Sequence, residues 1–228
     1  MPRTSTKTTV QAVKNAPPIK LEGLVAVHIT VTGISPMLQN PMTDETLDML
    51  IDRVPGRKGN KTGNEKTHEQ IAAERLCKGP DDELGIPMTW LFAALVEAGR
   101  HVVYSNKTKL STRESSLVPA FLAIQDEFLP FNNQADNSWV VDKRRGVLAA
   151  TGVAVGILRP KFPTWDFDVV AEVDCDQISM DKIRELFDIA GRFCGLGDFR
   201  PNKRGPFGRF MISHWEVKEL QRQLPKAA

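Results

Sequence analysis

The stretch from Cys194 to Phe210, CGLGDFRPNKRGPFGRF, constrains the fold more than any other part of the chain. Its four glycines and two prolines interrupt any helix or central strand, so the backbone there must form a loop with unusual dihedral angles. The loop carries four basic residues against one acid, Asp198. Guanidinium groups and main-chain N–H groups in such a loop can share the oxygens of a phosphate. The residues expected to contact phosphate or nucleic acid are Gly195, Gly197, Arg200, Lys203, Arg204, Gly205, Gly208 and Arg209.

Two alternatives stay open within this loop. Its glycines either admit a phosphate or only form a tight structural turn, and phosphate binding is the favoured interpretation because four bases surround them. Phe199 and Phe207 are either groups that stack on or wedge between bases, or ordinary core residues. Core packing is the favoured interpretation for these two rings.

The flanking segments predict a helix that leads into the loop and a strand that leaves it. Ser179 is suited to the N-cap of the helix, and Asp181 falls in its first turn. Residues 207–217 are rich in strand formers. Apolar residues recur at helical spacing and predict one buried face, made of Ile183, Leu186, Phe187, Ala190, Phe193 and Cys194.

Earlier segments predict the rest of a small α+β core. Strict alternation from Leu24 to Thr32 predicts a half-buried strand with Val25, Val27, Ile29 and Val31 on the buried face. Pro87 and Gly99 bound a second helix. Strands are expected at 151–158 and 167–174, with prolines forcing a turn or an edge at 159–163.

With about 54–80 and 104–148 treated as insertions, this order predicts a ferredoxin-like (RRM-like) βαββαβ fold with an antiparallel sheet. Its helices would cover one face of the sheet and leave the other face open to bind RNA. The expected organisation is a mobile basic arm at 1–20, a single domain at 21–220 and a tail at 221–228. A short helix is expected after Thr43, and another within 66–77.

Three stretches resemble the repeat-associated mysterious protein (RAMP) superfamily, the RNA-binding subunits of CRISPR complexes. The loop order Gly-x-Gly, basic spacer, Gly-x-x-Gly-Arg-Phe is similar to that superfamily's glycine-rich loop, although its spacer is longer. The stretch from Gly85 to Leu95 resembles its Ile-Pro-led first helix, with Met88-Thr89-Trp90 in place of the usual Gly-Ser-Ser. The stretch Gly33 to Leu38 resembles its strand-then-proline start. The whole chain also resembles a group of phage and prophage reading frames.

This resemblance implies a ferredoxin-like fold and a non-catalytic protein that coats a guide or other single-stranded RNA through backbone contacts. It also implies self-association along the RNA, sibling subunits, and complementary DNA or RNA as the target. The inserted loops 53–66 and 104–148 would embrace the RNA and touch the neighbouring copy.

Charge is segregated along the chain in a way that fits a polyanion-binding surface. Net charges of +4, +4, +4, +2 and +3 fall in 1–20, 53–66, 100–113, 142–145 and 196–209, although the whole chain carries only +2. Ordinary solvated loop lysines are the alternative for any one segment. The further residues expected to contact RNA are Arg57, Lys58, Lys61, Lys107, Lys109, Arg113, Lys143, Arg144 and Arg145.

No catalytic or cofactor motif stands out, and we expect neither an enzyme nor a cofactor. The chain has no GxxxxGK[ST], GxSxG or HExxH motif. The histidines are His28, His68, His101 and His214. His28 lies on the strand face expected to bind RNA and is the weak candidate for an acid or base, although an ordinary polar residue is the favoured interpretation. Asp44, Asp48 and Asp52 repeat at helical spacing, and a solvated helix face is favoured there over a metal site. Cys77, Cys175 and Cys194 are expected to be structural thiols.

Two other functions remain as alternatives. One is a phage single-stranded DNA-binding or annealing protein, and the other is a metal-independent endoribonuclease that processes repeat RNA with His28. The sequence has no run of eighteen apolar residues and no secretory start, so no membrane partner is expected and the expected location is the cytoplasm of a bacterial host cell.

Overall fold

The core of the protein is a four-stranded antiparallel sheet in the order β11-β1-β10-β6. The computed structural model describes residues 19–42, 66–135, 138–147 and 152–222. Within these ranges, β1 and β11 are long and pair along most of their length, whereas β6 is short and pairs only with β10. The strands are β1 (Ile19–Gly33), β6 (Leu122–Ile124), β10 (Asp166–Asp174) and β11 (Phe210–Arg222).

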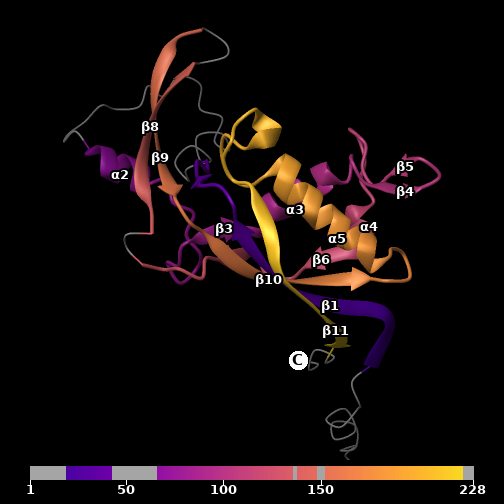
Figure 1. The fold of residues 1–228 in the computed structure, drawn as a ribbon. Coiled ribbons are helices and arrows are strands. Elements are labelled where there is room, and N and C mark those ends of the chain that lie inside the picture. Colours follow the sequence, from indigo (N-terminus) through magenta and orange to yellow (C-terminus); the bar gives the residue numbers. More distant parts are fainter. Residues whose placement is uncertain (1–18, 43–65, 136–137, 148–151, 223–228) are drawn as a thin grey trace, which may run out of the picture.

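Two helices, α3 (Met88–Ala98) and α5 (Met180–Ile189), lie on one face of this sheet (Figure 1). Along the chain the core elements follow the order strand, helix, strand, strand, helix, strand. The fourth strand pairs with the first, and the third lies between the first and the second. This is the ferredoxin-like βαββαβ arrangement, so the predicted fold class is confirmed.

The alternation in β1 places its apolar residues against the helices as predicted. Val27, Ile29 and Val31 are buried, whereas His28 and Thr30 point to the open face of the sheet. Successive strand side chains point to opposite faces, and the helices therefore cover only one of them.

Both helices begin where the sequence predicts. Pro87 is the N-cap of α3 and Gly99 its C-cap, because proline sets a suitable backbone angle before a helix and glycine readily ends one. Ser179 is the N-cap of α5, with Asp181 in the first turn near the positive end of the helix dipole.

The end of the second helix differs from the prediction. After Ile189 the chain forms a π-helical turn, η1 (Ala190–Cys194), in which the N–H of Gly195 donates to the carbonyl of Ala190, five residues back, at 2.8 Å. This turn is wider than an α-helical turn, so the spacing used for the prediction does not hold across it. Phe193 is 55% exposed, and the prediction that it is buried is wrong.

The second core strand also lies elsewhere than expected. It is β6, inside the range 104–148 that the sequence assigned to an insertion, and not the strand expected at 151–158. That later strand belongs to a separate three-stranded sheet in the order β2-β9-β8, and it continues through Pro160 as the central strand, where a turn or an edge was expected. The carbonyl of Pro160 accepts a hydrogen bond from Gln39, so the residue is held within this sheet. The strands are β2 (Met37–Leu38), β8 (Val140–Val147) and β9 (Ala154–Phe162).

Smaller elements surround these two sheets. The helix expected within 66–77 is α2, which begins with a capping box formed by Thr67 and Gln70. Residues 1–18 of the arm, the helix after Thr43 and residues 53–65 of the basic loop lie outside the described residues. Ile19 and Lys20, expected in the arm, belong to β1, and Gln221 and Arg222, expected in the tail, belong to β11. The remaining elements are α2 (His68–Ala73), β3 (Gly85–Pro87), β4 (Val103–Ser105), β5 (Thr108–Lys109), α4 (Val118–Phe121), β7 (Phe128–Pro130) and the 3₁₀ turn η2 (Pro201–Lys203).

Because of the π-helical turn, replacing two phenylalanines that were both predicted to be buried should have different effects on the free energy of unfolding. Phe187→Ala removes a fully buried ring and is expected to lower the free energy of unfolding by about 3–5 kcal/mol. Phe193→Ala removes an exposed ring that contacts the His101 ring and the Arg192 guanidinium, and it is expected to cost about 1 kcal/mol or less. Urea denaturation of both variants measures the difference, and equal losses would contradict the exposed position of Phe193.

Candidate nucleic-acid interface

The glycine-rich loop, Gly195–Arg209, is hydrogen-bonded to β2 and to the segment that joins β1 to β2. The N–H of Asp198 donates to the carbonyl of Leu38 at 2.7 Å, and the N–H of Gly208 donates to the carbonyl of Pro36 at 2.8 Å. The N–H of Arg209 donates to the Ser35 hydroxyl at 2.9 Å. The loop is therefore a fixed part of the fold over its described length.

Close backbone packing accounts for at least two of its glycines. Gly208 has φ +69° and lies so close to Leu196 that a Cβ would overlap the Leu196 carbonyl, while the N–H of Leu196 donates to the Gly208 carbonyl at 2.8 Å. A Cβ at Gly205 would overlap the carbonyl of Phe199. The N–H groups of Gly205 and Gly208 are already bonded within the fold, so the tight structural turn explains these glycines.

The basic side chains of the loop differ in how far they reach solvent. Lys203, Arg204 and Arg209 are exposed. Arg200 is half-buried, and its guanidinium donates to the carbonyl of Gly197 at 2.7 Å. Phosphate contacts at this loop would therefore come from three exposed cations, with Arg200 held closer to the protein.

A buried arginine ties the loop to the β8–β9 hairpin. Arg159 on β9 is 5% exposed, and its guanidinium lies 2.6 Å from the Asp198 carboxylate and 3.5 Å from the Asp142 carboxylate. Arg144 on β8 pairs with Asp142 at 2.8 Å. Because each buried charge has an opposite partner, the four residues form a network that fixes the hairpin against the loop. We call it the Arg159 network.

The two loop phenylalanines have different environments. Phe207 is buried, and the Arg144 guanidinium lies over its ring at 4.7 Å from the centroid. Phe199 is 37% exposed, with its ring centroid 6.1 Å from that of Phe207. Core packing, the favoured interpretation, fits Phe207, whereas Phe199 reaches the surface where a base can stack.

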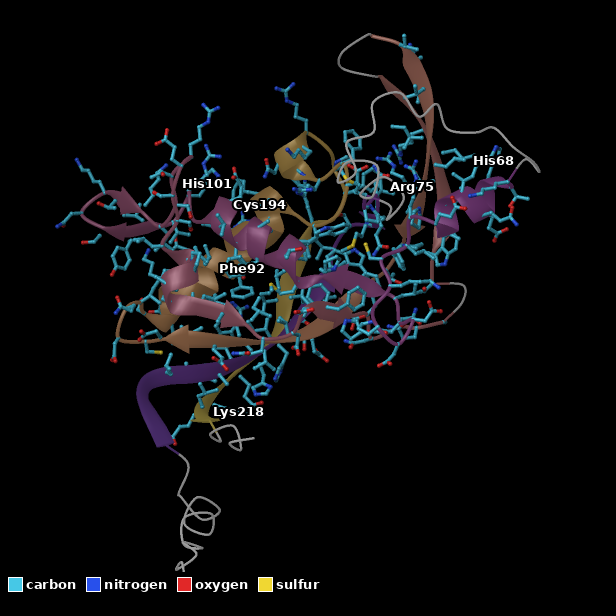
Figure 2. All side chains as sticks on the ribbon, turned by 180° about the vertical axis from the view of Figure 1, so that it is seen from behind. His68, Arg75, Phe92, His101, Cys194 and Lys218 are labelled. Atoms are coloured by element: carbon cyan, nitrogen blue, oxygen red, sulfur yellow. The ribbon has the colours of Figure 1, made fainter. Side chains whose placement is uncertain are left out.

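Two hairpins lie on either side of the loop, and all three project on the side of the sheet that carries the helices (Figures 1 and 2). On one side, β8 presents Arg144 towards the loop and Lys143 towards the opposite face, where Lys143 contacts His68 at 2.7 Å. On the other side, the β4–β5 hairpin carries Lys107 and Lys109, which are exposed, as are Arg113 and Arg145. Arg57, Lys58 and Lys61 lie outside the described residues.

The sequence did not predict the cluster of rings that lies at the surface beside η1. The rings of His101 and Phe193 stack with centroids 6.0 Å apart, and the Arg192 guanidinium lies 5.7 Å from the Phe193 centroid. The wider helical turn that exposes Phe193 leaves no recognisable sequence signal, because helical spacing predicts the opposite.

The charge on the open face of the sheet does not favour the RNA binding expected there. The charged side chains described on it are mostly acidic, and Lys218 pairs with Glu216 there at 2.9 Å. Thr30 donates to Asp168 at 2.6 Å. The described positions of β1, β10 and β11 that point to this face carry no Phe, Tyr or Trp for bases to stack on, and a polyanion would meet like charge. The carboxylates on it are Asp166, Asp168, Glu172, Asp174 and Glu216.

The histidines are dispersed over the structure. His28 lies on this acidic face opposite Glu216, and His214 lies 4.0 Å from the same carboxylate. The described residues contain no group of three or more His, Cys, Asp or Glu side chains that could hold a metal ion. Asp44, Asp48 and Asp52 lie outside those residues.

The three cysteines are free thiols. Burial raises the pKa of Cys77 to about 12, and burial with the nearby Glu97 carboxylate raises the pKa of Cys194 to about 12. Burial and two neighbouring aspartates also raise the pKa of Cys175. These thiols therefore stay protonated near neutral pH, as structural residues would.

The chain was compared with protein families, curated proteins and solved structures. Neither the scan against models of protein families nor the search of curated proteins found a match. Among solved structures, the chain is similar to one chain in the cryo-EM structure of the Type III-B Cmr-beta bound to cognate target RNA, with a TM-score of 0.48 and 12% sequence identity. The similarity covers 86% of this chain and 61% of that chain, so the chain spans less than two thirds of that chain's length. None of the described helices is long and apolar enough to cross a membrane.

The Arg159 network predicts a large cost for removing its central cation. Arg159→Leu leaves the carboxylates of Asp142 and Asp198 without their buried partner, so the free energy of unfolding should fall by about 3–5 kcal/mol in urea denaturation. Lys182→Leu removes an exposed ion pair of the same 2.6 Å length and should cost less than about 1 kcal/mol.

A rescue variant separates charge from packing. Asp142 keeps Arg144 as a partner, so adding only Asp198→Asn to Arg159→Leu removes the charge left unpaired and should recover part of the lost stability. Equal small losses for Arg159→Leu and Lys182→Leu would show that the network does not hold the hairpin to the loop.

Proposed function

We propose that the protein is a non-catalytic RNA-binding subunit that coats a guide or other single-stranded RNA through backbone contacts in an RNA-guided ribonucleoprotein. The observation that carries this proposal is the separation of charge between the two sides of the sheet. The glycine-rich loop and its flanking hairpins, which carry exposed cations, project on the helix side, and the charged residues of the open face are mainly carboxylates. A phosphate backbone would bind the first side and avoid the second.

Exposed aromatic groups support a single strand as the ligand. Phe193 is 55% exposed and Phe199 37% exposed, and both lie on the helix side near exposed cations. Only unpaired bases can stack on such rings, whereas the bases of a duplex are already stacked on one another. Phosphate contacts and sequence-tolerant stacking together suit a protein that coats a strand.

The resemblance of the glycine-rich loop, the Ile86-Pro87 helix start and the β1–β2 turn to RAMP proteins supports RNA over DNA and an RNA-guided assembly. In such an assembly, base pairing of the guide with complementary DNA or RNA supplies sequence specificity. The β4–β5 and β8–β9 hairpins are the segments that would reach a neighbouring copy or a sibling subunit along the strand.

Two triple variants with the same loss of charge test whether the cations of the glycine-rich loop bind phosphate. Changing Lys203, Arg204 and Arg209 to alanine removes three phosphate partners, so affinity for single-stranded RNA should fall and the slope of log K against log[salt] should flatten by about 2. The control changes Lys78, Lys182 and Lys218 to alanine; each pairs with a nearby carboxylate, and the same loss of net charge should leave the slope unchanged.

Fluorescence anisotropy over a range of salt concentrations measures both variants, and circular dichroism checks that they are folded. Equal slopes for the two variants would contradict a phosphate-binding role for the loop. Binding of single-stranded DNA as tightly as RNA of the same length would contradict the RNA assignment and favour an annealing protein.

A further inference from the structure

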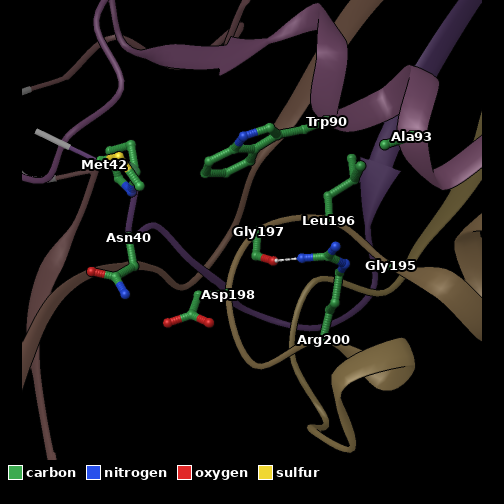
Figure 3. Close-up of a pocket in the computed structure, with 10 residues that line it drawn as sticks. Asn40, Met42, Trp90, Ala93, Gly195, Leu196, Gly197, Asp198 and Arg200 are labelled. Carbon is green, nitrogen blue, oxygen red and sulfur yellow. Dashed lines mark hydrogen bonds between the residues drawn. The ribbon is translucent and has the colours of Figure 1, made fainter. Parts of the chain in front are cut away.

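A cavity of about 280 Å³ lies beside the glycine-rich loop (Figure 3). The sequence motifs did not predict it. It is bounded by residues 40–42, by the start of α3 and by residues 195–198 with Arg200. We propose that this cavity holds one unstacked base of the bound strand. The proposal rests on the proposed function and adds a specific base-binding site to it.

The walls of the cavity suit a flat heterocycle. Trp90, in the first turn of α3, and Met42 face the space from different sides. An indole ring offers the stacking surface that bases prefer, and a thioether makes favourable contacts with aromatic rings. Cavities that hold drug-sized ligands measure about 300–1,000 Å³, so a space just below that range suits a ligand as small as a single base.

Polar groups of both kinds surround the same space. The carbonyl oxygen of the Asn40 side chain accepts from Arg75 at 2.6 Å, which leaves the amide N–H₂ as the donor that Asn40 can offer. Asp198 supplies a carboxylate, and the Arg200 guanidinium lies at the cavity edge (Figure 3). Donors and acceptors around a flat wall match the edge of a base, which carries both.

The polar residues of the cavity are held in place by contacts within the protein. Gln39, which is fully buried, donates to the Gly85 carbonyl at 2.7 Å and accepts from the N–H of Cys77 at 2.8 Å. These bonds hold the neighbouring Asn40 in place. Asp198 is held by Arg159 at 2.6 Å, and Arg200 by the Gly197 carbonyl at 2.7 Å. A preformed site loses little conformational entropy when a base enters.

The cavity also lies where a bound strand would pass. Asp198 and Arg200 belong to the loop that carries the exposed Lys203 and Arg204. A strand whose phosphates contact those cations can therefore turn one base into the cavity.

The test is a double-mutant cycle between Trp90 and the bases of the ligand. Wild type and Trp90→Ala are each titrated with single-stranded RNA of about 16 nucleotides and with an abasic strand of the same length and charge. In the wild type, bases should strengthen binding relative to the abasic strand. In Trp90→Ala, that advantage should shrink by about 5- to 150-fold while affinity for the abasic strand is unchanged.

Three further variants separate stacking from folding. Trp90→Phe keeps a flat ring and should retain most of the base-dependent affinity. Met211→Ala, at an exposed position on the open face, should change neither titration. If Trp90→Ala does not fold, Asn40→Ala at its exposed position should reduce the base-dependent affinity in its place.

The outcomes distinguish this inference from the proposed function. An unchanged base advantage in Trp90→Ala, or in a folded Asn40→Ala that replaces it, would overturn the base site and leave the phosphate-binding surface standing. No binding of either strand by the wild type would overturn both. Adenosine or uridine monophosphate that binds as tightly as the strand would assign the cavity to a free nucleotide and also overturn the proposal.

Discussion

The candidate interface depends on one buried cation, Arg159, which joins parts of the chain that are distant in sequence. Its guanidinium contacts Asp142 in the β8–β9 hairpin and Asp198 in the glycine-rich loop. Burying these charges carries a desolvation cost that only close pairing offsets, so the network tolerates little movement of either segment. The loop is also bonded to the β1–β2 turn, and both the Arg200 guanidinium and the cavity beside Trp90 take their positions from it.

This anchoring changes how the glycines are understood. At Gly205 and Gly208 the absence of a side chain allows two backbone segments to meet, and the N–H groups there are bonded inside the protein. The loop therefore acts as a rigid support that presents side chains. The exposed Lys203 and Arg204 belong to this loop, which projects on the side of the helices (Figure 1), whereas the carboxylates of β10 occupy the opposite face. The charge that a ligand meets is set by which side of the sheet it approaches.

Local patterns predicted the core elements well, because strand alternation and helix capping depend on neighbouring residues. The buried face of β1, the start of α3 at Pro87 and the start of α5 at Ser179 all follow from such patterns. Long-range pairing was not predictable in this way. β6 is too short to mark itself as a core strand, and the partners of Arg159 lie far along the chain. The open face was assigned to RNA from the fold class alone, without counting the charges that β10 places there.

The most direct test of the account is to map where RNA touches the protein. Single-stranded RNA containing 4-thiouridine would be bound, irradiated and digested, and the crosslinked peptides would be located by mass spectrometry. The account predicts crosslinks in the glycine-rich loop, near Trp90 and near Phe193, all on the helix side of the sheet. Crosslinks concentrated on the open face, around His28 and Glu172, would contradict it.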